Sequence, residues 1–232
     1  MGQGAESSPD AAVFDREALP RVVPFAAYMA FSVVAMLLER AGLGAEQLRW
    51  LYPVKVGTVL AILLWYRRQY VELLSGGLGA RDAAWAVVVG VVVLVLWVTL
   101  DAGWMQIGTS AGFDPRTNGQ VDWLLVACRI AGAALVVPVM EELFWRSFLM
   151  RWIDAPAFLA LSPRAVGVRG FVVSVLLFGS EHNLWFAGVV AGAAYSWLYI
   201  RSQNLWQPIL AHAVTNGLLG AWIMFTGQWS YW

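Results

Sequence analysis

Long apolar stretches separated by short polar ones are the main pattern along this chain of 232 residues. About 20 helical residues are needed to cross a hydrocarbon core about 30 Å thick. Seven stretches are candidates for such helices: 22–38, 51–66, 83–100, 123–152, 170–182, 184–200 and 205–225. The second and fifth are short, which leaves a count of six to eight. The pattern predicts an all-α fold, a polytopic bundle of about seven transmembrane helices.

Composition supports a membrane protein and excludes an ordinary soluble domain. Hydrophobic residues make up 60% of the chain, charged residues only 13%, and the mean hydropathy is +0.64. The 14 tryptophans suit a chain with many membrane–water boundaries. The net charge of zero gives no indication of nucleic-acid binding. The single cysteine, Cys128, excludes an intramolecular disulfide, and we expect it to pack as a small apolar residue.

The polar start of the chain differs from the rest. Residues 1–20 are mostly small or polar and predict a disordered cytoplasmic tail. Residues 21–232 contain no repeat and no separating linker, so we expect one transmembrane domain. Residues 101–122, rich in glycine and aspartate, predict an exposed loop.

Arginine placement predicts the orientation of the bundle. With seven spans, most arginines fall on one side, and the positive-inside rule makes that side cytoplasmic. The amino terminus is then cytoplasmic and the carboxyl terminus outside. The cytoplasmic set is Arg16, Arg21, Arg67, Arg68, Arg81, Arg151, Arg164, Arg169 and Arg201, and the opposite set is Arg40, Arg49 and Arg116.

Three titratable residues are predicted at similar depths inside the membrane. At about 1.5 Å per helical residue, counted from the arginines at the cytoplasmic ends, Glu141 lies about 15 Å deep, His182 about 20 Å and His212 at most about 16 Å. His182 and His212 are the only histidines of the chain. Ionisable groups inside a membrane are costly and usually functional. We therefore expect these three side chains to converge.

Helical spacing sorts the groups around them. Glu142 and Arg146 are four residues apart, which predicts a structural ion pair. Glu141 points about 100° away from Glu142 and has no partner on its own helix. His212 and Asn216 share a face at the same spacing, and offer an imidazole and an amide.

Two further groups are interpreted as structural. Glu181 is expected to face away from His182, near the membrane boundary. Arg129 is expected to pair with Asp122, seven residues earlier on the outer half of the helix.

Several hydrolytic designs are excluded by the motifs. The chain has no His-Glu-x-x-His motif of helical zinc proteases. Ser180 is two positions from His182, on the wrong face to pair with it. Cys128 lies thirteen residues before Glu141, about 20 Å along a helix, and is too distant to be a nucleophile there. A carboxylate, two imidazoles and an amide remain.

These residues form three short motifs in order on successive predicted helices: Glu141-Glu142-x-x-x-Arg146, Phe178-x-x-x-His182 and His212-x-x-x-Asn216. Together they resemble the motifs of the CAAX protease and bacteriocin-processing family, also called the abortive-infection family, which includes the type II CAAX prenyl endopeptidases. The resemblance covers about residues 135–217, within a motif core that we place at 121–225. The size and the tryptophan-rich ending are similar to the bacterial branch associated with exosortase systems.

The resemblance implies a glutamate-dependent intramembrane endopeptidase without an obligatory metal. Glu141 would be the general base, and His182 would help to bind and polarise the attacking water. His212 and Asn216 would stabilise the oxyanion. General-base and oxyanion roles suit a carboxylate and hydrogen-bond donors on facing helices.

Supporting roles and one alternative complete the site. Glu142 and Arg146 would orient their helix, and Phe178 belongs to the second motif. A zinc-dependent version stays open, because two imidazoles and a carboxylate can hold zinc with an open position. Its ligands would be Glu141, His182 and His212.

The resemblance implies a membrane-associated protein or peptide as substrate, cleaved near its tail. In eukaryotic members this is the carboxyl-terminal tripeptide of a prenylated protein. The predicted location is a bacterial cytoplasmic (inner) membrane, with the polar cluster nearer its cytoplasmic face. A non-catalytic scaffold or immunity protein of the same fold, and a proton-coupled transporter using buried Glu and His, remain alternatives.

Overall fold

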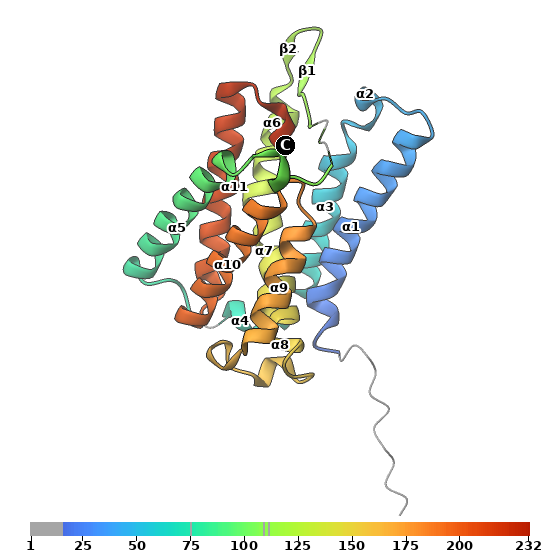
Figure 1. Ribbon diagram of the computed structural model, residues 1–232. Helices are drawn as coiled ribbons and strands as arrows, with labels where there is room; N and C mark the ends of the chain where they lie inside the picture. Colours follow the sequence, from blue (N-terminus) through green and yellow to red (C-terminus); the bar gives the residue numbers. More distant parts are fainter. Residues whose placement is uncertain (1–15, 75, 109, 111) are drawn as a thin grey trace, which may run out of the picture.

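Five helical segments in the described part of the chain are long and apolar enough to cross a membrane. The computed structural model describes residues 16–74, 76–108, 110 and 112–232 (Figure 1). The five are α1 (Leu19–Arg40), Glu46–Gln69 around α3 (Leu51–Tyr66), α5 (Ala80–Thr99), Trp123–Trp152 and α11 (Trp206–Thr226). The shorter helices α9 (Val168–Ser180) and α10 (Trp185–Ser202) pack against each other as a hairpin.

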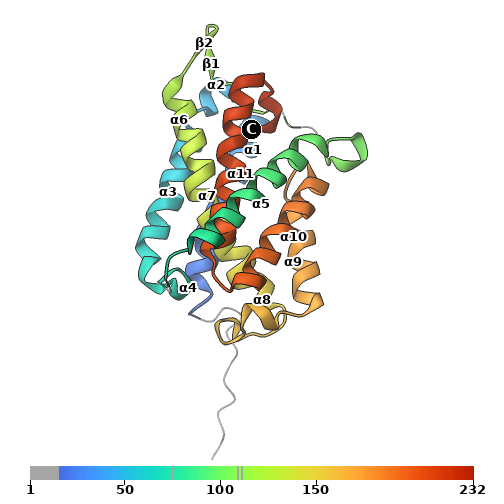
Figure 2. The same ribbon diagram turned by 90° about the vertical axis from the view of Figure 1, so that its left-hand side faces the viewer.

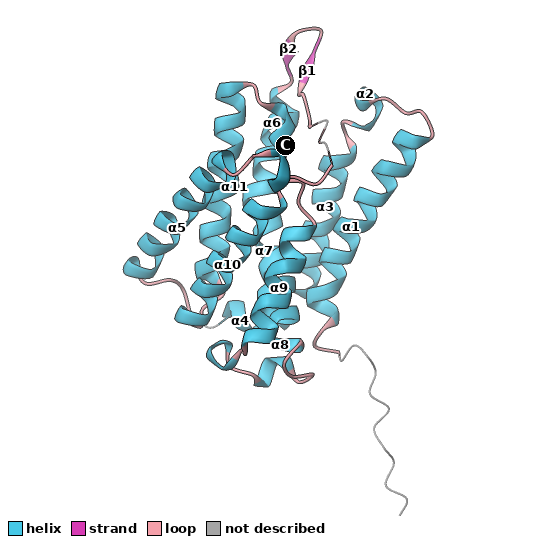
Figure 3. Cartoon of the chain, viewed as in Figure 1, coloured by secondary structure: helices cyan, strands magenta, loops and turns pink. Residues whose placement is uncertain are grey.

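Each of the seven predicted segments is helical, so the prediction of an all-α polytopic bundle is confirmed (Figure 3). The chain is an integral membrane protein. Of the predicted tail, residues 1–15 lie outside the described residues. Helix α1 begins at Leu19, because Pro20 fits the first turn of a helix, so the last two residues of the predicted tail are helical.

The segment Trp123–Trp152 is the central helix of the bundle. Of its most apolar window 44% is buried inside the protein, against 6% for α1. It is continuous but not regular. Two wider π-helical stretches, η3 (Gly132–Val136) and η4 (Leu143–Leu149), surround α7 (Val137–Glu142), with α6 (Trp123–Ala131) before and α8 (Met150–Trp152) after.

Pro138 explains the first π-helical stretch. Proline has no N–H and its ring crowds the preceding turn, and a wider turn relieves this crowding. In the π register the missing N–H leaves the Ala133 carbonyl without its helical donor. Asn216 on α11 donates its Nδ2 to that carbonyl at 2.8 Å. One motif residue thus stabilises the π-helical stretch of the helix that carries another.

Glycines allow two close helix approaches around the centre. A Cβ on Gly179 of α9 would overlap with the Val189 side chain of α10, and a Cβ on Gly90 of α5 would lie 2.5 Å from the Ala211 carbonyl oxygen of α11. Figure 2 shows α5 lying across α11, with the α9–α10 pair beside them. These contacts fix α11, which carries His212, and α9, which precedes His182.

A buried ionic cluster ties the bundle together at the end where α1 begins. We call it the base cluster: Arg21, Glu72, Ser147 and Arg151. Arg21 Nε donates to Glu72 Oε1 at 2.8 Å, Ser147 Oγ donates to the same carboxylate, and Arg151 Nη2 donates to Ser147 Oγ at 2.7 Å. Burial acts to raise the pKa of Glu72, but the hydrogen bonds and the charge of Arg21, together with the hydrogen bond from Ser147, outweigh it and hold that pKa below its usual value. The cluster joins α1, α4 (Val71–Leu74), η4 and α8.

The predicted loop 101–122 lies over the opposite end of the bundle. It contains η2 (Gly103–Met105) and a small hairpin of β1 (Arg116–Thr117) and β2 (Gln120–Val121). Ile107 N donates to the Asn183 carbonyl at 2.8 Å, and Phe113 N donates to the Trp229 carbonyl at 3.3 Å. The loop therefore links the α9–α10 turn to η7 (Trp229–Tyr231), which follows α11.

Candidate active site

All four residues predicted to act in catalysis line one cavity of about 210 Å³. Glu141 comes from α7, His182 from the turn after α9, and His212 and Asn216 from α11. Helix α9 has 13 residues, about 20 Å in length, which is shorter than the apolar core of a bilayer. The turn that carries His182 therefore lies within membrane depth, as the convergence of the three titratable groups requires.

Glu141 lies at the centre of the group. Glu141 is only 7% exposed, and its Oε2 lies 3.9 Å from Nε2 of His212. Oε2 has no hydrogen-bond partner among the described residues. A buried carboxylate oxygen without a donor is costly, which indicates a place for a water or substrate group.

His212 connects Glu141 with the predicted ion pair. Glu142 Oε2 and Arg146 Nε are 3.2 Å apart, and both side chains are essentially fully buried. Glu142 Oε1 lies 2.9 Å from Nδ1 of His212. A carboxylate can only accept, so Nδ1 carries a hydrogen, and this fixes Nε2 as the nitrogen that faces Glu141.

A chain of contacts behind His212 holds its ring in place. The Tyr195 ring stacks on the imidazole, with centroids 4.9 Å apart and an interplanar angle of 18°. Tyr195 donates its hydroxyl to Thr215 at 2.8 Å, and Thr215 donates to the Gly90 carbonyl at 2.9 Å. Helices α10, α11 and α5 thereby fix the plane of this imidazole.

His182 has a different arrangement. Its Nδ1 lies 2.8 Å from the Phe178 carbonyl oxygen, which can only accept. Nδ1 therefore carries the hydrogen, and in the neutral ring Nε2 is an acceptor. The Phe178 ring lies between the motifs, 4.8 Å from the His182 ring and 4.2 Å from the Arg146 guanidinium. Phe178 thus packs against residues of the first two motifs, and its supporting role stays a prediction.

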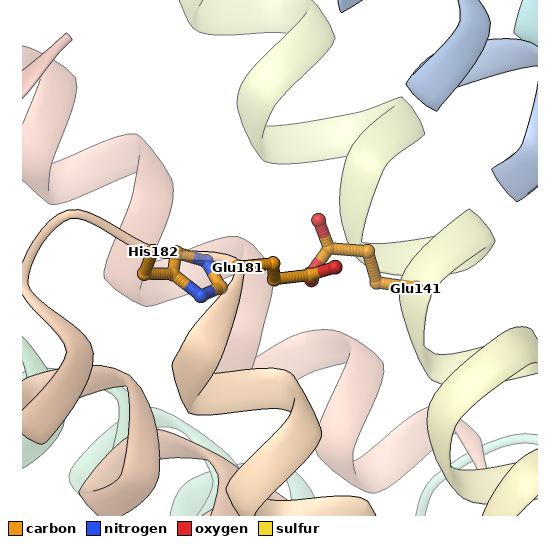
Figure 4. A group of neighbouring side chains, drawn as sticks. All are labelled: Glu141, Glu181 and His182. Atoms are coloured by element: carbon orange, nitrogen blue, oxygen red, sulfur yellow. The ribbon is translucent and has the colours of Figure 1, made fainter. Parts of the chain in front are cut away.

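The expectation that Glu181 faces away from the site is wrong. One ligand atom each from Glu141, Glu181 and His182 lie within 4.8 Å of one another (Figure 4). Helix α9 ends at Ser180, so the rotation of 100° per residue no longer applies to the next two positions. Trp145 Nε1 donates to Glu181 Oε1 at 3.2 Å and holds this second carboxylate beside Glu141.

The expected pair of Arg129 and Asp122 is also absent. Asp122 Oδ1 caps α6 by accepting from the N–H groups of Leu124 and Leu125 at 3.1 and 3.2 Å, and its Oδ2 lies 3.9 Å from Arg49. The capping position turns the aspartate toward the helix start and away from Arg129. Arg129 instead lines the cavity that contains Glu141.

The distances between the possible zinc ligands are longer than those between the ligands of a bound zinc ion. Oxygen and nitrogen ligands bind zinc at about 2.0–2.2 Å, so tetrahedral neighbours lie roughly 3.3 Å apart. The gap from Glu141 to His212 is 3.9 Å, and Glu141, Glu181 and His182 meet only within 4.8 Å. Two hydrogen bonds of about 2.8 Å to one bridging water span such gaps. A bridging water thus fits the observed gaps, and the residues that could hold a metal ion are Glu141, Glu181 and His182.

The cavity leads toward the end of the bundle that holds the last residues of the chain. Its wall includes Tyr52 near the start of α3, Trp97 near the end of α5, and Tyr231 and Trp232. In Figure 1 these ends lie opposite the start of α1. Glu141 sits in the half of the central helix that is nearer the predicted cytoplasmic face. Its cavity, however, leads away from that face.

Comparison with known families matches the part of the chain that carries the three motifs. Residues 123–218 match the family model described as type II CAAX prenyl endopeptidase, Rce1-like. Neither a curated protein nor a solved structure matches the chain. The predicted resemblance is confirmed over residues 123–218, and the model that they match is that of a protease family.

Proposed function

We propose that this protein is an intramembrane endopeptidase in which Glu141 activates a water molecule. The observation that carries the proposal is the buried, unpartnered Oε2 of Glu141 in a cavity shared with both histidines. The match to a protease family over the same residues supports the reaction class.

The attacking water is held between Glu141 and His182. The carboxylate accepts one hydrogen of the water and Nε2 of His182 accepts the other, because Nδ1 already donates to the Phe178 carbonyl. Glu141 takes the first proton as the oxygen attacks the peptide carbonyl carbon. After attack, the protonated Glu141 gives that proton to the leaving amine. Proton transfer by a positioned side chain contributes about 10²–10⁴-fold to a rate.

His212 and Asn216 stabilise the developing oxyanion. When Nε2 of His212 is also protonated, the imidazolium is supported by the Glu142 carboxylate on Nδ1, 2.9 Å away. Asn216 uses one hydrogen of its Nδ2 for the Ala133 carbonyl and has a second hydrogen available. Donors held in advance at an oxyanion lower the barrier without reorganising during the reaction.

The substrate is a membrane-associated protein or peptide, cleaved near its tail. The arginine distribution favours a cytoplasmic amino terminus in a bacterial inner membrane. In that orientation the cavity leads toward the outer face. A reporter that is active only outside the cytoplasm, fused after Trp232, tests this: activity supports the orientation and its absence contradicts it.

The function is tested by mass spectrometry of membrane-protein termini. Membranes from cells that express the wild type are compared with membranes from cells that express Glu141→Gln at equal protein level. We expect new termini near membrane segments that depend on Glu141. A scaffold predicts identical termini in both strains, and that result would refute the peptidase.

Zinc use is the second candidate because Glu141, Glu181 and His182 converge. Purified protein is treated with a chelator and then supplied with zinc. We expect cleavage to continue in the chelator. Loss of cleavage that zinc restores would establish the zinc-dependent version instead.

A further inference from the structure

A second cavity of about 190 Å³ adjoins the cavity that contains Glu141. Arg129 and Tyr52 line both, so these two side chains form the shared wall. The second cavity lies toward the hairpin end of the bundle and is also lined by Phe113 of the 101–122 loop. Neither the proposed water attack nor the three motifs use this region.

Arg129 has no carboxylate within ion-pair distance in the part of the chain that the structure describes. Its guanidinium carbon lies 4.3 Å from the Tyr52 ring centroid and 5.2 Å from that of Phe113. Aromatic faces attract a guanidinium and leave its N–H groups available. An arginine held on two rings without an acid partner, facing a cavity, is arranged to receive an anion.

The other charged residues of the second cavity do not neutralise the positive charge of Arg129. Lys55 lies 3.7 Å from the Tyr28 ring centroid and donates to Ser32 Oγ at 3.3 Å. Among the described residues it has no acid partner within ion-pair distance either. Glu39 is the acidic residue of the lining. The lining also contains three cations: Arg129, Lys55 and Arg49. Of these, Arg49 lies 3.9 Å from Asp122, which is outside the cavity.

We propose that Arg129 binds a carboxylate of the peptide substrate and so determines which peptides enter the site. The inference rests on the function proposed above. Arg129 and Glu141 are twelve residues apart on one continuous helix, roughly 18 Å along its axis. An extended peptide spans that length with about five residues. The carboxylate therefore belongs a few residues from the cleaved bond, at a chain end or on an acidic side chain.

The test measures binding without cleavage. Full-length protein carrying Glu141→Gln in nanodiscs is presented with three matched pools of short palmitoylated apolar peptides. One pool ends in a free carboxylate, one in a carboxamide, and one in a carboxamide with a single internal aspartate. Cleavage of the same pools by the wild type is measured separately, so a failed peptidase and a failed anion site are distinguishable.

We expect at least one carboxylate pool to bind about tenfold more tightly than the plain carboxamide pool, as for one charge-assisted hydrogen-bond pair. The preference should disappear in Arg129→Gln and persist in part in Arg129→Lys. It should be unchanged in Arg116→Gln, a matched change at an exposed arginine that pairs with Asp114 at 2.6 Å. Which pool binds identifies the source of the carboxylate.

Protection of Arg129 from phenylglyoxal provides a second measurement that needs no variant at that position. The preferred carboxylate pool should slow modification of Arg129, and the carboxamide pool should not. Equal binding of all pools, or a preference that survives Arg129→Gln, would overturn the proposal. Binding of dodecyl phosphate through Arg129 with no peptide preference would assign the site to lipid headgroups and contradict it as well.

Discussion

Two buried ionic clusters lie at different depths of the same helical bundle and differ in how completely they are paired. In the base cluster Glu72 accepts from Arg21 and Ser147, and no atom of the four residues is among the unpartnered buried polar atoms of the described chain. In the Glu141 cavity, by contrast, Glu141 Oε2 lacks a partner.

The difference separates structural groups from catalytic ones. A buried charge with all its hydrogen bonds satisfied stabilises a fold or fixes its geometry. A buried charge left incomplete beside a cavity stays ready for a ligand. Arg146 and Glu142 lie between these cases. They form an ion pair at 3.2 Å and Glu142 also contacts His212, but Glu142 Oε2 and Arg146 Nε and Nη1 make no hydrogen bond among the described residues. Substitutions in the base cluster should therefore lower stability and leave cleavage unchanged. Substitution of Glu141 or His182 should lower cleavage without a loss of stability.

Apart from substitution of Glu141 itself, the largest effect on cleavage is expected for His182→Ala. Loss of the Nε2 acceptor removes one of the two groups that hold the water, and we expect cleavage to fall about 10²–10⁴-fold. The melting midpoint should stay close to that of the wild type, because the hydrogen bond that the His182 side chain makes within the described chain goes to a backbone carbonyl, and water can replace it. Cleavage rate and midpoint are measured on the same preparation. A rate within a few-fold of the wild type would remove His182 from the mechanism.

Glu142→Gln should affect both properties. The change leaves the fully buried Arg146 without its acid partner, and breaking a buried pair costs about 3–5 kcal/mol. It also weakens support of His212, which we expect to lower cleavage about 10–100-fold, as for groups that orient a ligand or base. Unfolding free energy and cleavage per folded molecule separate the two effects. Unchanged stability would contradict a structural role for the pair.

Glu72→Gln should affect stability alone. Arg21 is 1% exposed and would lose its acid partner, for an expected loss of about 3–5 kcal/mol in unfolding free energy. Cleavage per folded molecule should equal that of the wild type. Glu46→Gln, at an exposed position near the other end, is the matched control and should change neither quantity. A selective loss of cleavage in Glu72→Gln would break the distinction between the clusters.

The smallest effect is the dependence of stability on pH. Because the pKa of Glu72 is lowered in the folded state, its contribution is complete above the unfolded value of about 4.3. That contribution is lost as the pH falls through the folded pKa. The melting midpoints of the wild type and Glu72→Gln should therefore differ at pH 7 and approach each other in acid. A constant difference down to acid pH would show that the charge of Glu72 is not responsible.

The sequence predicts the fold well and the site in part. Helix bounds differ by three residues or fewer from those expected, as for 22–38 against Leu19–Arg40, because apolar length decides where a helix crosses a membrane. The convergence of Glu141 and the two histidines also followed from depth alone. What failed depends on tertiary detail: the end of α9 before Glu181, and the capping role that removes Asp122 from Arg129.

The π-helical stretches show why spacing alone is insufficient. A period of 3.6 residues predicts that Glu142 and Arg146 pair, and the pair forms although a wider turn begins at Leu143. The same period gives no indication that Asn216 donates to the Ala133 carbonyl. That bond arises because Pro138 removes a donor, an effect that a sequence pattern signals only as a possible kink.

The most direct test measures cleavage by purified Glu141→Gln in nanodiscs, on a substrate identified from the comparison of termini. The neutral amide has nearly the size of the carboxylate but cannot take a proton from water. We expect no detectable cleavage and a melting midpoint equal to or above that of the wild type, because an incompletely paired buried charge is removed. Cleavage at the wild-type rate by this folded variant would contradict the assignment of Glu141 as the base.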